Sequence, residues 1–328
     1  MGKSKFGPAR MAQLSLMAAA LAAVLRIGVA APGPLAFSDT GEGVFSFDTG
    51  ALKGSLRAAP RAQGMPALVD ARSGVEIARG GDYPGLFSYY RFLGANKRWG
   101  DAARDWPKSA ERLADGAVRV HWPAQPAHPI AMTATYRWKS PDTLDLETVV
   151  RPDVDARDFE VFLSSYFTSG FRSFVYTSPT LHAPGRPAFL AADVNPLVRG
   201  TYLAFPRDRR AAQLIFDGRW DYGPNPVHFS VARFFAAPLC MRRDDKSGIA
   251  AVILSRPDDC LAIETPYNMD PPDGIANHGS MYLSLFGRDL RAGQEARALT
   301  RLVVGHGLSD PDAVRLYERF VAETTGKP

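Results

Sequence analysis

Three consecutive segments between residues 116 and 150 alternate apolar and polar side chains with a period of two. They span residues 116–122, 130–138 and 143–150, and the turn sequence Ser140-Pro141-Asp142 joins the last two. Along 130–138, one face carries Met, Ala, Tyr and Trp, while the other carries Thr and Arg. Successive side chains of a β-strand point to opposite sides, so this pattern predicts antiparallel strands with one buried and one solvent-facing side. Such strands need a second apolar layer to cover them.

Similar short runs fill most of the remaining chain and are separated by turns rich in Gly and Pro. They lie at residues 44–47, 52–57, 67–69, 75–77, 158–167, 171–176, 212–216, 227–235, 249–254, 261–264, 281–286 and 299–304. Residues 309–325 predict the single helix, because Ser309 can cap it and apolar residues recur at helical spacing. We therefore predict an all-β fold, a large antiparallel β-sandwich with one C-terminal α-helix. Residues 32–328 show no break in composition, which predicts a single domain.

The last two apolar runs carry a resemblance to a known family. Residues 281–286 and 299–304 flank a polar loop that contains Gly287, Gly293 and the turn sequence Arg-Ala-Gly-Gln-Glu. This pattern resembles the C-terminal edge of galactose-mutarotase-like supersandwich domains. The resemblance implies a supersandwich fold and a carbohydrate ligand.

One mutarotase feature is missing from the sequence. Mutarotases carry a first histidine just before a strand pair, and the similar segment 162–167 has Ser164 and Ser165 there instead. Proton transfer at a sugar hemiacetal needs an acid and a base that titrate near neutral pH, and serine alone supplies neither. Aldose epimerase activity of the mutarotase kind is therefore not expected.

The N-terminus has the pattern of a secretory signal peptide. Lys3, Lys5 and Arg10 precede an apolar run at residues 14–25, and small residues follow at 28–30. The apolar run is shorter than the about 20 residues that a membrane-spanning helix needs. We predict that residues 1–31 are a signal peptide and that the mature protein, 32–328, is periplasmic or secreted and not bound to a membrane.

The basic character of the chain belongs to that N-terminal segment. Residues 1–31 carry four of the 39 basic residues and none of the 34 acidic ones, which leaves 35 basic residues in the mature chain. A nearly neutral mature protein gives no reason to expect binding to nucleic acid. The oligomeric state is not predicted.

Two cysteines, Cys240 and Cys260, are present in the mature chain. A disulfide is chemically permitted in an exported protein. If the strands follow one another in a simple meander, these residues lie on strands about 10 Å apart, which exceeds the about 7 Å that a disulfide spans between Cα atoms. We expect free thiols, with a disulfide possible only if the sheet order is not sequential.

Residues 85–106 are the densest group of candidate ligand-binding side chains. Aromatic rings can cover the C–H face of a sugar, while Arg and Asp make directed hydrogen bonds to hydroxyl groups. The candidates in this segment are Arg91, Arg98, Trp99, Asp105 and Trp106. The alternative is that the rings belong to the core and the charges to a solvated loop.

A second group of candidates lies between residues 205 and 228. We expect Arg207, Arg219, Trp220 and His228 to contact a ligand, next to Asp217. An internal Arg–Asp contact that holds two loops together explains the same residues equally well.

Candidates for proton transfer are His278, Glu264 and Asp217. His278 is the best single candidate, because histidine titrates near neutral pH, although a lone histidine is often structural. The sequence contains no phosphate-binding glycine loop and no pair of cysteines at metal spacing. We predict neither a metal nor a cofactor.

These features lead to one hypothesis and its alternatives. The first is an exported carbohydrate-binding or carbohydrate-active protein that takes a glycan at a concave β-sheet face, as a hydrolase, lyase or isomerase if it is an enzyme. A module that binds glycan without catalysis would use the same aromatic and arginine residues. The last alternative is a cell-envelope assembly or structural subunit that binds another protein.

Overall fold

The protein is described from a computed structural model, which covers residues 1–2, 35–59, 61–95, 97–181, 184–192, 202–223, 226–266 and 279–325. Residues 34–328 form one compact unit, and residues 1–33 are a separate one. The predicted signal peptide therefore lies outside the described residues, apart from Met1 and Gly2.

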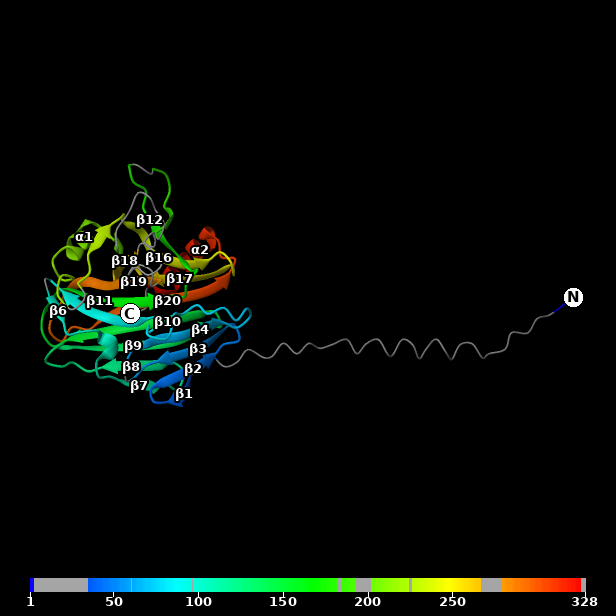
Figure 1. The fold of residues 1–328 in the computed structure, drawn as a ribbon, viewed down its shortest axis with the longest axis horizontal. Helices are drawn as coiled ribbons and strands as arrows, with labels where there is room; N and C mark the ends of the chain where they lie inside the picture. The colour runs from blue at the N-terminus through cyan, green and yellow to red at the C-terminus, as the bar shows by residue number, and fades with distance from the viewer. Residues whose placement is uncertain are drawn as a thin grey trace. The chain divides into compact units, whose positions relative to one another are not determined.

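Two large sheets form the body of this unit (Figure 1). The larger has nine strands in the order β13-β12-β16-β17-β20-β10-β9-β8-β7. Its strands are β7 (Ser109–Arg112), β8 (Val118–Trp122), β9 (Ile130–Ser140), β10 (Thr143–Pro152), β12 (Arg172–Thr177), β13 (Ala188–Ala191), β16 (Phe235–Asp244), β17 (Ile249–Ser255) and β20 (Ala296–His306). All pairs in this sheet are antiparallel.

The second large sheet has seven strands in the order β15-β14-β18-β19-β11-β5-β6. Its strands are β5 (Ser88–Gly94), β6 (Lys97–Trp99), β11 (Ala156–Tyr166), β14 (Tyr202–Pro206), β15 (Phe229–Val231), β18 (Cys260–Pro266) and β19 (Ser280–Leu290). Its pairs are antiparallel except β14–β15, which is parallel. A four-stranded sheet comprises β1 (Ser38–Gly41), β2 (Val44–Asp48), β3 (Leu52–Arg57) and β4 (Gly64–Asp70).

The main core contains side chains from both large sheets. Tyr136 of β9 and Leu163 of β11 are buried in the same cluster, together with Trp122 and Phe92. The alternation predicted for 130–138 is confirmed, since its apolar face is buried there. Because two apolar sheet faces cover each other, the predicted all-β sandwich is confirmed as well.

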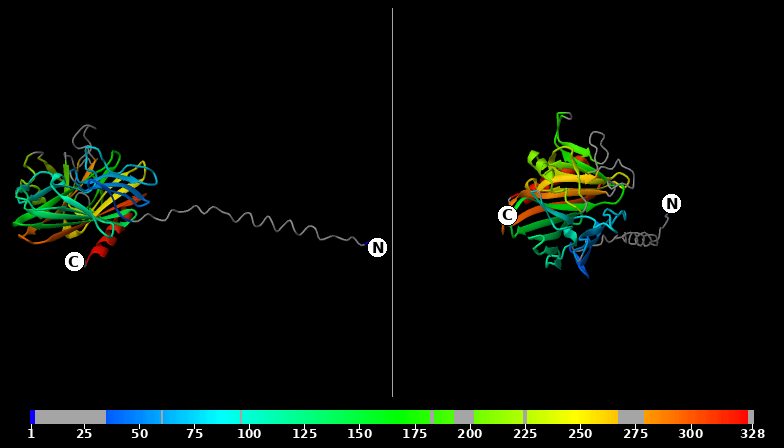
Figure 2. Two further views of the ribbon diagram at one scale, coloured as in Figure 1. Left: turned by 90° about the horizontal axis from the view of Figure 1, so that it is seen from below. Right: turned by 60° about the vertical axis from the view of Figure 1, so that its left-hand side comes forward.

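The predicted C-terminal helix is α2 (Asp310–Thr324). The Ser309 side chain accepts from the Asp312 backbone, and the Asp312 side chain accepts from the backbone of Ser309. Ala313 and Phe320 pack against side chains of β16, β17 and β20 in a cluster separate from the main core. Figure 2 shows α2, in red, outside the sheets. No helix among the described residues is long and apolar enough to cross a membrane.

The strand predicted at 212–216 is wrong, because residues Arg209–Ile215 form a short helix, α1. The Asp208 side chain caps it by accepting from the Ala211 backbone at 2.8 Å. Ala211, Leu214 and Ile215 are buried on one side of α1. A short apolar run does not by itself distinguish a strand from a helical turn, and the acidic cap decides here. Two 3₁₀ turns, η1 (Ala103–Asp105) and η2 (Pro257–Asp259), complete the helical segments that the structure describes.

The two cysteines are free and buried, as expected. The geometric reason was wrong, however, because the chain is not a simple meander. Cys240 lies in β16 of the nine-stranded sheet, whereas Cys260 lies in β18 of the seven-stranded sheet. Burial raises the pKa of both thiols, so both remain protonated.

Candidate functional site

The candidate site lies on the outer face of the seven-stranded sheet, the side that does not contribute to the main core. Strand register shows which side chains share this face. Phe162 of β11 pairs with Ser284 of β19, and Ser284 pairs with Ala262 of β18. Two residues further along these strands, Tyr282 pairs with Glu264. Residues Phe162, Ala262 and Tyr282 belong to a cluster that is separate from the main core.

A bulge in β5 places two neighbouring residues at this face. Arg91 pairs with Phe162, but Tyr89 pairs with Leu163, which leaves Tyr90 without a partner in β11. An extra residue in one strand changes the alternation locally and redirects a side chain. Tyr89 is buried in the main core, whereas Tyr90 packs against the outer cluster, next to Arg91.

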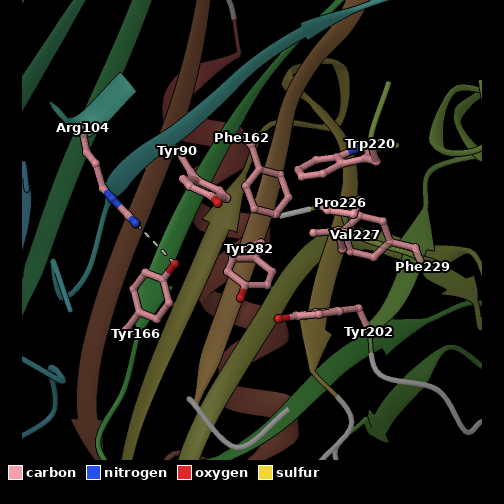
Figure 3. A pocket seen from close by; sticks show the side chains of 10 residues that line it. All are labelled: Tyr90, Arg104, Phe162, Tyr166, Tyr202, Trp220, Pro226, Val227, Phe229 and Tyr282. Atoms are coloured by element: carbon pink, nitrogen blue, oxygen red, sulfur yellow. Dashed lines mark hydrogen bonds between the residues drawn. The ribbon is translucent and has the colours of Figure 1, made fainter. Parts of the chain in front are cut away.

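A cavity of about 410 Å³ opens on this face. Figure 3 shows its side chains, which come from β5, β11, β14, β15, β19, the η1 turn and the segment around Trp220. The lining residues are Tyr90, Arg104, Phe162, Tyr166, Tyr202, Trp220, Pro226, Val227, Phe229 and Tyr282. Most are aromatic, and the tyrosines add hydroxyl groups to the apolar walls.

The aromatic rings of the lining pack against one another. The Phe162 ring centroid lies 4.6 Å from that of Trp220 and 4.8 Å from that of Tyr282. Trp220 also contacts Phe229 edge-on at 5.2 Å. Such ring contacts hold the walls in a fixed shape, since each ring limits the rotation of its neighbour.

The tyrosine hydroxyls supply uncharged polar atoms to the cavity. Burial, followed by the neighbouring tyrosines, raises the pKa of Tyr202 to about 12. The same causes raise the pKa of Tyr282 well above its ordinary value, and Ser280 donates to its hydroxyl at 2.5 Å. These phenols therefore stay protonated at physiological pH and can both donate and accept hydrogen bonds.

Two arginines flank Tyr90 at one end of the cavity. The Arg104 guanidinium lies 4.8 Å from the centroid of the Tyr90 ring, and the Arg91 guanidinium lies 4.7 Å from the same centroid. Arg91 also stacks on Trp220 at 4.9 Å. Arg104 donates weakly to the Tyr166 hydroxyl at 3.5 Å, as the dashed line in Figure 3 marks.

The η1 turn holds Arg104 in place. The indole of Trp122 donates to the carbonyl of Ala103 at 2.9 Å, and Lys108 donates to the carbonyl of Arg104 itself at 2.8 Å. The Asp105 side chain accepts from the Ala62 backbone at 2.9 Å. The backbone under Arg104 is thus fixed before any ligand binds.

A buried cluster of charges adjoins the cavity on the same face. Arg219, next to Trp220, donates to Glu160 at 2.9 Å and makes a two-point contact with Asp217 at 3.0 and 2.9 Å. The Arg219 side chain is fully buried, and that of Glu160 is 1% exposed. Arg219 and Asp217 thus make an internal Arg–Asp contact, but within one segment rather than between two loops, and Glu160 links this segment to β11.

Ser284 connects Glu160 to Glu264. Its hydroxyl oxygen lies 2.7 Å from a Glu160 oxygen and 2.9 Å from a Glu264 oxygen. One hydroxyl proton serves one carboxylate, so the second short contact requires a proton on a glutamate. Burial and the nearby charge of Glu160 raise the pKa of Glu264 well above its usual range. Burial also raises the pKa of Glu160, but Arg219 opposes that shift. Glu264 therefore holds the proton.

Of the predicted ligand-binding residues, Trp220 lines the cavity and Arg91 stacks against its wall. Trp99 and Trp106 instead belong to the main core, where Trp106 stacks on His128 at 3.7 Å. Arg98 donates to the carbonyl of Tyr222 at 3.2 Å, which ties β6 to the segment near the cavity.

The remaining predicted residues lie elsewhere or make internal contacts. Asp105 accepts from the backbone of Ala62, and Arg207 pairs with Asp208 at 3.1 Å. His228 is largely exposed, 3.8 Å from Asp221. Among the catalytic candidates, Asp217 and Glu264 belong to the buried charge cluster, and His278 lies outside the described residues. The catalytic assignment stays a prediction. Within the described part of the chain, no group of three or more potential metal-ligand side chains is close enough to hold a metal ion.

Most of the cavity lining was not predicted from the sequence. Tyr90 and Arg104 lie within the candidate segment 85–106, but apart from Trp220 the predictions did not include the other lining residues, Phe162, Tyr166, Tyr202, Pro226, Val227, Phe229 and Tyr282. One signal was available in the sequence. Phe162 and Tyr166 are four residues apart on one predicted strand, so their side chains point to the same face of the sheet. The contribution of separate strands such as β14 and β19 depends on sheet order, which the sequence did not reveal.

Comparison with known proteins gives structural matches only. No protein-family model matches the sequence, and no curated protein matches it. The Slr1438 protein from Synechocystis sp. PCC 6803 is 10% identical, with a TM-score of 0.48 over 82% of this chain and 94% of its own. An aldose epimerase homologue from C. elegans is 10% identical, with a TM-score of 0.45 over 78% of this chain and 96% of its own.

A mutant heparan sulfate lyase from Pedobacter heparinus is 8% identical, with a TM-score of 0.45 over 85% of this chain and 38% of its own. The likeness to these structures is one of fold alone.

Proposed function

We propose that this chain is a carbohydrate-binding protein that takes a saccharide in the cavity on the outer face of the seven-stranded sheet. The observation that supports this proposal is the combination of packed aromatic rings and tyrosine hydroxyls around one cavity of about 410 Å³. A sugar ring has apolar C–H faces and a polar rim, so it needs both kinds of contact. The cavity also falls within the about 300–1,000 Å³ typical of small-molecule sites.

The proposal is one of binding rather than of proton transfer. The described residues that line the cavity include no carboxylate and no imidazole. Asp217 is engaged with Arg219, and Glu264 is buried with a proton that it shares through Ser284. A general acid or base must reach the reacting atoms, and neither carboxylate is among the residues that line the cavity.

The test is a binding titration with the mature chain, residues 32–328. We would screen a glycan array and then measure affinities by calorimetry for the sugars that bind. Trp220→Phe removes part of the cavity wall and should weaken binding about tenfold, or about 1.4 kcal/mol. Trp99→Phe is the matched control, because Trp99 is as buried as Trp220 but lies in the main core.

The two variants separate the outcomes. If Trp99→Phe keeps the wild-type affinity and Trp220→Phe loses it, the cavity is the binding site. If both bind alike, the sugar binds elsewhere and the proposal is wrong. If no glycan on the array binds, the assembly-subunit alternative gains support, and a protein partner should be sought.

Export belongs to the same proposal. It rests on the basic N-terminus and the apolar run at residues 14–25. Cell fractionation of the full-length chain, followed by the intact mass of the soluble product, tests it. A mass that includes residues 1–31 in the cytoplasmic fraction would contradict export.

A further inference from the structure

We infer that the saccharide carries an acidic group, which binds at the end of the cavity where Arg104 and Arg91 flank Tyr90. This inference deepens the proposed function and rests on it. The class of ligand is a sugar with a carboxylate, sulfate or phosphate substituent. Three properties of this end of the cavity support the assignment.

The first property is the arrangement of the cations. Both guanidinium groups stack on the Tyr90 ring, with distances of 4.7 and 4.8 Å to its centroid. The pair concentrates positive charge at one end of the cavity. An anion that binds there is attracted by this charge, whereas a neutral sugar is not.

The second property is the weak compensation of Arg104. In the described part of the chain its ion pair is with Asp105, at 4.0 Å, and its hydrogen bond to the Tyr166 phenol is 3.5 Å long. By comparison, Arg219 makes charged contacts of 2.9 Å to two carboxylates. A guanidinium fork prefers short, paired contacts to a planar anion, and Arg104 lacks such contacts here.

The third property is access. The Arg104 side chain is 22% exposed and lines the cavity, so a ligand can reach it. Arg91 is fully buried behind the wall. Burial, followed by the charge of Arg98, lowers the pKa of Arg91, which means that its surroundings disfavour the charged form of Arg91 itself. An anion at this end of the cavity would favour that charged form. Arg104 would contact the acidic group directly, and Arg91 would add positive charge from behind the cavity wall.

The experiment compares matched neutral and acidic sugars by titration calorimetry of residues 32–328. The pairs are D-glucose with D-glucuronate, and D-galactose with D-galacturonate. Glucose 6-sulfate and glucose 6-phosphate distinguish an ester from a carboxylate. We expect the best acidic sugar to bind at least about tenfold more tightly than its neutral partner. The ratio should shrink as salt rises from 0.05 to about 0.5 M, since salt screens the attraction.

Arg104→Gln tests the site. It should reduce the ratio of acidic to neutral affinity to about one, and Arg104→Lys should keep part of it, because lysine retains the charge but not the fork. Arg137→Gln is the control: Arg137 is an exposed arginine of the other sheet, paired with Asp115, and its loss should leave the ratio unchanged. Thermal unfolding of each variant confirms that it is folded.

The outcomes distinguish the inference from the function beneath it. Equal affinity for neutral and acidic sugars overturns the inference and leaves the carbohydrate proposal intact. A ratio that survives Arg104→Gln also overturns it, because the anion then binds elsewhere. Arg104→Gln that weakens both sugars equally shows a structural role and overturns it too. Failure of every sugar to bind removes the proposed function itself.

Discussion

On the outer face of the seven-stranded sheet, two regions contain arginines whose charges are satisfied in different ways. In the buried charge cluster, Arg219 contacts both Glu160 and Asp217 at 2.9 Å. At the end of the cavity, Arg104 contacts mainly aromatic rings, and its ion pair with Asp105 is 4.0 Å long. Residue type alone therefore does not distinguish a structural arginine from one that is available to a ligand. What distinguishes them is whether the guanidinium already makes short contacts to carboxylates.

The difference has an energetic consequence. Removing charges from water costs several kcal/mol for each ion, and a buried pair recovers this only through close contacts. Arg219 has those contacts, so a substitution that removes it leaves a carboxylate buried without a partner, and the desolvation cost of that carboxylate is no longer offset. Arg104 remains partly hydrated, so its removal costs the fold little and should cost the ligand more. A substitution in the buried cluster should therefore mainly lower stability, whereas a substitution of Arg104 should mainly weaken ligand binding.

The largest expected effect is on stability. Arg219→Met leaves Glu160 buried without its cation, and the free energy of unfolding should fall by about 3–5 kcal/mol. Arg104→Gln should lower it by less than about 1 kcal/mol. Urea unfolding at pH 7, with an unchanged dependence on denaturant, measures both. If the two substitutions cost the same, the distinction between the regions is lost.

The second effect depends on pH and concerns the proton on Glu264. Its pKa is raised in the folded state, so between the unfolded pKa near 4.5 and the folded pKa the native state binds the extra proton. Stability must then fall as pH rises through this window. Each pH unit costs up to about 1.4 kcal/mol for one such group.

Glu264→Gln removes this titration while keeping the size of the side chain. The stability of the variant relative to wild type should therefore increase as pH rises above about 4.5, until the folded pKa of Glu264 is passed. Parallel urea titrations at each pH measure the difference. A difference that does not change with pH would mean that Glu264 is ionised, and the proton would then have to be placed on Glu160.

The sequence predicted the sandwich well because its signal is local. Period two along 130–138 and the Ser309 cap each depend on neighbouring residues, and both are confirmed in β9 and α2. The strand expected at 212–216 was wrong for a related reason. Its apolar residues suit either structure, and the capping contact of Asp208 favours the helix.

The site was predicted less well because its signal is not local. Trp220 and Trp99 look alike in sequence, since each lies beside an arginine, but only Trp220 lines the cavity. Which of them faces outward depends on the order of strands and on the path of the connections. Tyr202 and Tyr282 join the site because β14 and β19 both pair with β18. No pattern within either strand reveals that neighbour.

The third prediction compares the loss of one tyrosine hydroxyl in the cavity with the loss of one in the main core. Tyr202→Phe removes a polar atom from the cavity and should weaken sugar binding by about 0.5–1.5 kcal/mol, or about 2- to 12-fold. Tyr89→Phe breaks a 2.5 Å hydrogen bond to Thr148 in the main core. It should lower stability by about 1–3 kcal/mol because Thr148 is left unsatisfied. Its sugar affinity should not change; a shared loss of affinity would show that the core substitution distorts the cavity.

The smallest effect concerns an exposed ion pair that is as short as the buried ones. Arg137 and Asp115 lie 2.7 Å apart, but their side chains are 47% and 52% exposed. Water already solvates both charges, so Asp115→Asn should lower stability by about 0.2–1 kcal/mol, and this difference should vanish in about 1 M salt. The salt series, run beside Arg219→Met, separates two explanations of the buried cluster. If burial is decisive, the cost of Arg219→Met persists in salt. If contact distance alone were decisive, Asp115→Asn and Arg219→Met would lower the free energy of unfolding equally. The difference between Arg219 and Arg104 would then have to be explained by contact distance and not by burial.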